Sequence, residues 1–176
     1  MARFKSWIWV PACAAAITAG AQVEVPLGEV PFTLQSFFVL LAGFLLGSLR
    51  GTLAAALYLA AGACGLPVFS GGAAGFARLA GPTAGFLWGF LPMAAIAGLA
   101  IRKGQWQGWR NALLWGTIGT GALLALGLPW LGYSRGLDRS EVAAVALSLL
   151  PGAAIKLAAG VTLGAVLAEK RKAGQV

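Results

Sequence analysis

A lysine inside an apolar stretch is the residue of this sequence best suited to bind a ligand. Lys156 lies in the apolar run 142–168, five positions after Pro151, which is about 7–8 Å along a helix. A charge within hydrocarbon costs about 2.5–3.5 kcal/mol on insertion scales and usually marks a functional interior site. Glycines at 152, 160 and 164 leave a smooth helix face from which only Lys156 projects. Lys156 is therefore a candidate ligand contact, and the alternative is a lysine that snorkels to the membrane interface.

Other polar candidates stand where loops meet apolar runs. Thr33 and Gln35 follow a proline-containing loop and could either hydrogen-bond a ligand or cap a helix. Arg78 is the one cation of the glycine-rich segment 67–81 and could bind an anionic ligand group or a lipid phosphate. Irregular backbone at membrane depth must be covered by protein or line a cavity, so we expect this segment to form a lid or a site wall.

Several kinds of chemistry are disfavoured. The chain has no histidine for general-base work, no G-x-x-x-x-G-K-[ST] phosphate loop and no acid deep in an apolar run for proton coupling. Cys13 and Cys64 lack metal-type spacing and are expected to be small buried packing residues. We therefore expect neither an enzyme nor a metal or cofactor site, but a binding protein that needs partners to move its ligand.

The composition indicates that membrane-spanning helices position these candidates. Hydrophobic residues make up 59% of the 176, charged residues only 10%, and the mean hydropathy is +0.83; soluble domains carry roughly 25% charged residues. The net charge of +8 is spread between apolar runs rather than gathered in a patch, which argues against nucleic-acid binding. We expect one all-α domain over residues 1–176, a compact bundle in contact with membrane lipid.

Six spans account for nearly the whole chain, at about 6–23, 32–47, 51–66, 82–101, 110–129 and 151–168. The run 142–168 is too long for one span, and Pro151-Gly152 is expected to separate a short peripheral helix, 142–150, from the last span. Residues 3–21 also look like a cleavable signal peptide, but because further spans follow we interpret them as an uncleaved first helix.

Charge asymmetry predicts the orientation. With a cytoplasmic N-terminus, nine basic residues fall inside and three outside, as the positive-inside rule requires. The nine are Arg3, Lys5, Arg50, Arg102, Lys103, Arg110, Lys170, Arg171 and Lys172, and the three are Arg78, Arg135 and Arg139. We expect a multi-pass protein of the prokaryotic inner (plasma) membrane with both termini in the cytoplasm.

Small residues recur along the first helix. Ala12, Ala16 and Gly20 share one face, with Ala15 and Ala19 beside them. Such spacing permits close helix packing, either inside the chain or against an external membrane partner. On composition alone, internal packing is favoured because alanine is abundant throughout.

Three motifs occur in order along the chain. Residues 30–35 read Val-Pro-Phe-Thr-Leu-Gln; residues 65–69 read Gly-Leu-Pro-Val-Phe, with a glycine-rich run and Gly-Pro-Thr-Ala-Gly-Phe at 81–86 after them; and Pro151-Gly152 precedes Lys156. Together these segments resemble the BioY family, the biotin-specific S components of energy-coupling-factor (ECF) transporters.

The resemblance implies a six-helix bundle that captures biotin from the outer face under lids made by the first and third loops. It implies partners as well: a transmembrane coupling protein, the T component, and two ATP-binding-cassette ATPases, which hydrolyse ATP in place of this chain. The ligand contacts it implies are Thr33, Gln35, Phe69, Arg78, Thr83, Phe86 and Lys156, and the residues that dock the coupling protein are Ala12, Ala15, Ala16 and Ala19.

Two positions depart from the family pattern. Where the family reads Pro-Gly-Asp-x-x-Lys, this chain has Ala153 in place of the aspartate, and Phe86 stands where a tyrosine is usual. An aspartate is well suited to accept from the two N–H donors of the biotin ureido group. An S component for another small vitamin or a biotin precursor therefore stays an alternative, as does a non-transport membrane scaffold.

Overall fold

Helices form most of the chain in the computed structural model, which describes residues 7–25, 30–102 and 105–173. They are α2 (Trp9–Gln22), α3 (Gln35–Ala63), α4 (Ala84–Ala97), α5 (Trp109–Arg135) and α6 (Arg139–Ala173). By length and composition α3, α5 and residues Arg139–Ala168 of α6 could each cross a membrane, and Ala84–Ala100 is a shorter apolar helix. Arg3, Lys5 and Lys103 of the charge argument lie outside the described residues, as do residues 26–29 of the first loop and the side chains of Arg102, Lys170, Arg171 and Lys172.

Short elements connect the helices. Strand β1 (Glu24–Val25) pairs antiparallel with β2 (Phe32–Thr33), and β3 (Ile101–Arg102) pairs with β4 (Gln105–Trp106). The glycine-rich segment contains two 3-10 turns, η1 (Ser70–Gly72) and η2 (Phe76–Leu79), and η3 (Gly98–Ala100) extends α4. Because Thr33 pairs with Glu24, the first loop returns to the end of α2 before α3 begins.

Helix α3 folds back on itself at Gly47. This residue has φ 78° and ψ 177°, a conformation open to glycine and strained for other residues. A Cβ atom at Gly51 would lie 2.8 Å from the Cα atom of Gly43, although eight residues span about 12 Å along a straight helix. Residues 35–46 and 48–63 are therefore two antiparallel arms. The reversal needs one residue, whereas the predicted spans 32–47 and 51–66 leave residues 48–50 for a turn.

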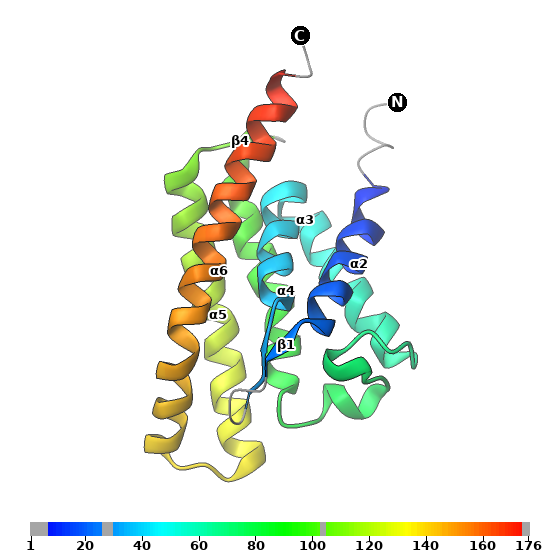
Figure 1. Cartoon of the computed structure of the whole chain (residues 1–176), viewed down its shortest axis with the longest axis vertical. Coiled ribbons are helices and arrows are strands. Elements are labelled where there is room, and N and C mark those ends of the chain that lie inside the picture. The colour runs from blue at the N-terminus through cyan, green and yellow to red at the C-terminus, as the bar shows by residue number, and fades with distance from the viewer. Residues whose placement is uncertain (1–6, 26–29, 103–104, 174–176) are drawn as a thin grey trace.

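The helices pack around α3 and α4 (Figure 1). Helix α4 lies between α3 and α5, α2 packs against α3, and α6 packs against α5 and α3. Glycines let α4 and α5 approach closely, since a Cβ atom at Gly119 would lie 2.9 Å from the backbone oxygen of Met93. The largest fully buried side chains include Phe44, Tyr58 and Leu40. The start of α2 and the end of α6 lie at the same end of the molecule.

Two prolines lie inside helices that the sequence predicted to end there. Helix α6 runs unbroken through Pro151, so the predicted division into a peripheral helix 142–150 and a separate last helix is wrong. Helix α5 likewise passes Pro129 and continues to Arg135. A proline removes one backbone hydrogen bond, whereas ending a helix in an apolar environment would leave several backbone groups unpaired.

A capping box fixes where α6 begins. The Ser140 hydroxyl donates to Oδ1 of Asp138 at 2.6 Å, and the Glu141 N–H donates to the same oxygen at 2.8 Å. The Glu141 carboxylate in turn accepts from the Asp138 N–H at 2.8 Å. The hydrogen bonds that the Asp138 carboxylate accepts, the one from the Ser140 hydroxyl first and then the one from the Glu141 N–H, hold its pKa below its usual value. The turn between α5 and α6 is therefore short and polar.

Three of the four alanines predicted to form a packing face on α2 are exposed. Its buried side consists of Val10, Ala14, Ile17, Gly20 and Ala21. Ala12, Ala15 and Ala19 are exposed and Ala16 is half-buried, so internal packing is the wrong interpretation for the first three. Cys13 is half-buried, but Cys64 is exposed because it caps the C-terminal end of α3. The prediction that Cys64 is a buried packing residue is therefore wrong.

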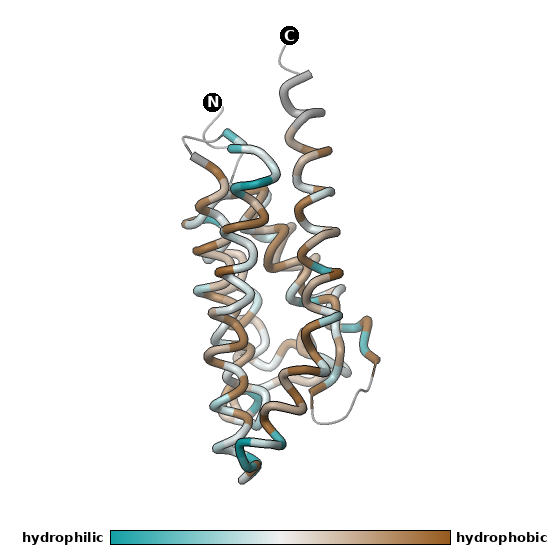
Figure 2. Tube along the Cα trace, turned by 90° about the vertical axis from the view of Figure 1, so that its left-hand side faces the viewer, coloured by the Kyte–Doolittle hydropathy of each residue, from teal (hydrophilic) through white to brown (hydrophobic). Residues whose placement is uncertain are grey.

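Hydrophobic side chains cover the outside of the bundle. Exposed apolar residues include Leu57 of α3, Ile118 of α5, and Leu147 and Ile155 of α6. In Figure 2 most of the hydrophilic teal lies toward the ends of the molecule, and the middle sections of the helices are white to brown. This distribution suits a lipid environment, in which apolar side chains face hydrocarbon and polar groups meet water at either end.

Candidate functional site: a pocket between the helices

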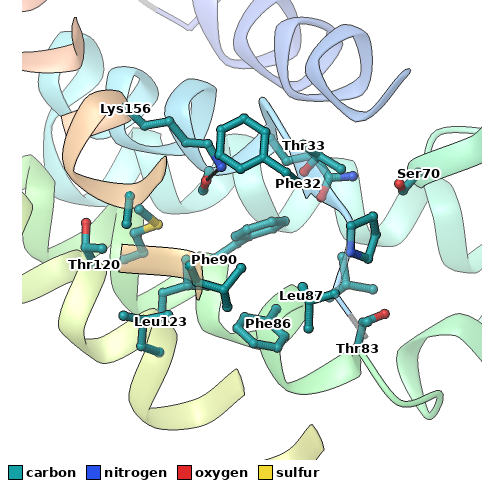
Figure 3. A pocket seen from close by; sticks show the side chains of 18 of the residues that line it. Phe32, Thr33, Ser70, Thr83, Phe86, Leu87, Phe90, Thr120, Leu123 and Lys156 are labelled. Atoms are coloured by element: carbon teal, nitrogen blue, oxygen red, sulfur yellow. Dashed lines mark hydrogen bonds between the residues drawn. The ribbon is translucent and has the colours of Figure 1, made fainter. Parts of the chain in front are cut away.

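One pocket lies between the first arm of α3, the glycine-rich segment, α4, α5 and α6. It comprises about 970 Å³ of space free of protein atoms, the open solvent at its mouth included. The walls are mainly apolar and aromatic, with a few polar groups among them (Figure 3). The residues that line it are Val30, Pro31, Phe32, Thr33, Gln35, Ser36, Leu40, Phe69, Ser70, Arg78, Thr83, Phe86, Leu87, Phe90, Met93, Thr120, Leu123, Leu124, Leu149, Ala153 and Lys156.

All seven ligand contacts expected from the sequence line this pocket. They come from six segments: Thr33 from β2, Gln35 from the start of α3, Phe69 from the residue before η1, Arg78 from η2, Thr83 and Phe86 from the beginning of α4, and Lys156 from α6. Arg78 is exposed and so lies toward the mouth, whereas Lys156 is half-buried. Contact between these residues and a ligand stays a prediction.

Lys156 is held by two contacts across the pocket wall. Its Nζ donates to Oγ of Ser36 at 3.1 Å and lies 3.9 Å from the centre of the Phe32 ring, a cation–π geometry. Figure 3 shows the amine beside that ring, with Phe86 and Phe90 on the other side of the pocket. The lysine points into the protein, so these contacts favour the functional interpretation over a side chain that snorkels to the membrane interface.

The pocket is positively charged. Lys156 and Arg78 contribute two cations, and none of the described residues that line the pocket is an aspartate or glutamate. Ala153 lies on the pocket wall three positions before Lys156, where a side chain would reach the lysine from about one helical turn away. The counter-charge for Lys156 must therefore come from outside these side chains, and an anionic ligand group would supply it.

A polar pair lies beneath the pocket wall. Nε2 of Gln35 donates to the Tyr58 hydroxyl at 2.9 Å, and the two residues are 6% and 1% exposed. They belong to the two arms of α3 and meet because of the reversal at Gly47. Of the two interpretations left open by the sequence for Gln35, the structure disfavours a helix cap, because its amide bonds a side chain and not the backbone of α3.

Three pocket aromatics each lie against a glycine of a neighbouring helix. A Cβ atom would collide with the Phe32 ring at Gly152, with the Phe69 ring at Gly62 and with the Phe86 ring at Gly127. Each ring therefore occupies the volume that a side chain on the facing helix would fill. These glycine contacts fix how far the three rings reach into the pocket.

Side chains from the end of α2 and the start of the first loop form hydrogen bonds with the glycine-rich segment. Nε2 of Gln22 donates to the backbone oxygen of Phe69 at 3.2 Å, and the Ser70 hydroxyl donates to the Glu24 carboxylate. Trp88 and Trp130 hold the segment from the other side through hydrogen bonds to the backbone oxygens of Leu79 and Gly81. The segment forms a wall of the pocket, as its composition predicted.

Sequence reasoning singled out neither the two residues that hold Lys156 nor the hydrogen-bond partner of Gln35. Phe32 belongs to the motif at residues 30–35 but was not singled out as a ligand contact. It lies three positions before Gln35, and Ser36 lies three positions after Thr33, so helical spacing could have suggested both residues. Tyr58 had no local signal, because its distance of 23 residues from Gln35 becomes a contact only through the α3 hairpin.

A bundle of apolar helices around a pocket with aromatic walls and few polar groups defines a membrane protein that binds a small molecule. The sequence profile of the BioY family matches residues 1–173. The chain therefore belongs to the BioY family.

Known proteins similar to this chain carry consistent names. A biotin transporter BioY of Thermotoga maritima is 46% identical over 119 residues, 68% of this chain and 69% of its own. A probable biotin transporter BioY of Pyrococcus horikoshii is 36% identical over 134 residues, covering 76% and 78%. The crystal structure of the S-component for biotin from an ECF-type ABC transporter matches with a TM-score of 0.86 at 27% identity, covering 94% of this chain and 91% of that one.

Proposed function

We propose that this chain is the biotin-capturing S component of an ECF-type vitamin importer in the cell membrane. The observation that supports this most directly is the pocket, which brings together Thr33, Gln35, Phe69, Arg78, Thr83, Phe86 and Lys156. The membership in the BioY family and the similarity to a biotin S-component of known structure support the same ligand.

The chemistry of the pocket matches the chemistry of biotin. Biotin combines an apolar bicyclic ring and alkyl chain with a ureido group and a carboxylate. Phe69, Phe86 and Phe90 offer apolar and aromatic surface to the ring and chain. Lys156 and Arg78 favour the carboxylate, since binding it neutralises a pocket that has no acid among its described lining residues.

We further propose six membrane crossings with both termini in the cytoplasm. The two arms of α3 are antiparallel, and the start of α2 lies at the same end of the molecule as the end of α6, which an even number of crossings requires. The pocket mouth would then face outward together with the turn between α5 and α6.

Transport would need the T component and two ATP-binding-cassette ATPases as partners, because nothing in the sequence provides an ATP-hydrolysing loop. The exposed Ala12, Ala15 and Ala19, with the half-buried Ala16, offer a flat docking face on α2. Replacing Ala15 by Trp should abolish co-purification with the coupling protein while biotin binding persists. Undiminished co-purification would contradict the docking face.

Titration calorimetry of the purified chain with biotin tests the ligand assignment. We expect micromolar or tighter binding, and we expect Lys156→Ala to weaken it about tenfold or more, about 1.4 kcal/mol. Arg139→Ala is the matched control, because it removes an equal charge from an exposed position at the start of the same helix. Biotinamide, which lacks the carboxylate, should bind more weakly than biotin.

Each result has a defined meaning. A folded sample that does not bind biotin contradicts the assignment, and other small anionic vitamins and biotin precursors should then be screened. Equal effects of Lys156→Ala and Arg139→Ala would mean that Lys156 acts only through general charge and not as a ligand contact.

A further inference from the structure

Gln35 is the one residue with a side-chain amide or acid group among the described residues that line the pocket. The other polar groups there are hydroxyls and two cations, and a cation cannot accept a hydrogen bond. The Ser36 hydroxyl already accepts from Lys156, and the Thr120 hydroxyl donates to the backbone oxygen of Gly116 at 2.8 Å. Because an amide carbonyl is a stronger hydrogen-bond acceptor than a hydroxyl, Gln35 carries the strongest side-chain acceptor among these lining residues.

The carbonyl oxygen of Gln35 is free to take that role. The amide nitrogen donates to Tyr58, and no described residue hydrogen-bonds Oε1. No side-chain oxygen or nitrogen of the described residues is both fully buried and unpartnered, so Oε1 keeps some accessible surface. Because Gln35 is only 6% exposed and lines the pocket, that surface faces the pocket.

In the structure the end of the Gln35 amide that meets Tyr58 is the nitrogen. A hydrogen bond from Nε2 to the tyrosine hydroxyl turns the opposite end of the amide, Oε1, toward the pocket. Tyr58 is itself held in place: it is 1% exposed and packs edge-on against Phe69, with ring centres 5.5 Å apart. Its ring also packs against Phe90 in a tilted arrangement, with ring centres 6.3 Å apart. The tyrosine does not line the pocket, so it can act on a ligand only through Gln35 and these rings.

We propose that Tyr58 is a positioning residue for ligand selectivity: it fixes the Gln35 amide so that Oε1 accepts a hydrogen bond from a ureido N–H of the ligand. This inference rests on the proposed binding of biotin. Gln35 thereby provides an acceptor in a pocket where Ala153 provides none. Tyr58 contributes no ligand contact of its own and sets the orientation of the amide that does.

The test measures the affinity for two ligands in a set of variants of the full-length purified chain. The ligands are biotin and a biotin analogue methylated at the ureido nitrogens, which keeps the carboxylate but has no N–H donor. The variants are Tyr58→Phe, which keeps the ring packing, Gln35→Leu, which removes the amide, and the double variant. Gln35→Glu tests the role of the acceptor, since a carboxylate can accept from both Tyr58 and the ligand.

We expect Tyr58→Phe to weaken biotin binding about fivefold to tenfold, the effect of one hydrogen bond, and to leave binding of the methylated analogue unchanged. In the Gln35→Leu background the tyrosine substitution should have no further effect on biotin. Gln35→Glu should bind biotin more tightly than Gln35→Leu does. The thermal midpoint without ligand is measured for every variant, because Tyr58→Phe also leaves the buried Gln35 amide nitrogen without its partner.

The outcomes separate this inference from the proposed function. If the wild-type chain binds biotin but Tyr58→Phe weakens both ligands equally, or weakens biotin equally with and without Gln35, the tyrosine is structural and the inference is wrong. Gln35→Glu binding no better than Gln35→Leu would also overturn it, because the amide would then act as a donor. A wild-type chain that binds no biotin would overturn the proposed function and this inference with it.

Discussion

Ala153 lies on the pocket wall about one helical turn before Lys156, where the family resemblance implies an aspartate. Without that carboxylate, Lys156 depends on the Ser36 hydroxyl and the face of the Phe32 ring. Neither neutralises its charge. At the residue scale the pocket is therefore built to take its negative charge from the ligand.

Restoring the carboxylate should reduce this dependence on ligand charge. In Ala153→Asp the new side chain can pair with Lys156 and cancel one of the two pocket cations. We expect the preference for biotin over biotinamide, the ratio of their dissociation constants, to fall about threefold or more, in the range of a solvent-accessible ion pair. Ala153→Asn, which has nearly the same shape and no charge, is the control. A ratio that changes equally in both variants would show that shape and not charge sets the preference.

At the scale of elements, the glycine contacts link helix packing to pocket shape. The glycines at 152, 160 and 164 were predicted to form one smooth face of α6, but their surroundings differ. A Cβ atom at Gly152 would collide with Phe32, whereas at Gly160 its nearest neighbour would be Phe44 at 3.6 Å, an ordinary contact. Only Gly152 therefore needs to be glycine for the Phe32 ring to reach Lys156.

This difference gives a matched pair of substitutions on one helix. Gly152→Ala should displace the Phe32 ring from Lys156 and weaken biotin binding about tenfold, since overpacking typically costs about 1–3 kcal/mol. Gly160→Ala should change the affinity by less than about twofold and raise the thermal midpoint, because alanine favours a helix over glycine by about 1 kcal/mol. Calorimetry and a thermal melt measure both effects. Similar affinities for the two variants would show that the position of Phe32 does not matter for the ligand.

At the scale of the whole molecule, the two ends of α5 provide a test of the proposed orientation in the membrane. It runs from the exposed Trp109 and Arg110 to Tyr133, whose side chain is 87% exposed next to the turn into α6. The charge asymmetry of the sequence assigns the first end to the cytoplasm and the second to the outside.

Cysteine labelling in intact cells tests this orientation. In a chain with Cys13 and Cys64 replaced by alanine, Tyr133→Cys should react with a membrane-impermeant maleimide, and Arg110→Cys should react only after the cells are permeabilised. Biotin binding by each variant confirms that it is folded. The opposite labelling pattern would reverse the proposed topology, and equal labelling of both positions would contradict a crossing by α5.

The sequence by itself determined the apolar helices, the irregular wall segment and the seven residues that meet in the pocket, because composition and local motifs act over short stretches of chain. Only the tertiary structure decided how far the helices continue and which side chains pair. Helices α5 and α6 continue through Pro129 and Pro151, because ending a helix in an apolar environment would leave backbone groups unpaired. The single residue Gly47 reverses the direction of α3.

The contacts that give the pocket its chemistry join distant residues. Gln35 meets Tyr58 across 23 positions and Lys156 meets Ser36 across 120. No local pattern encodes such pairs, because each depends on the packing of whole helices against one another. The residue types of the site could therefore be predicted from the sequence, while their partners and orientations follow from the packing.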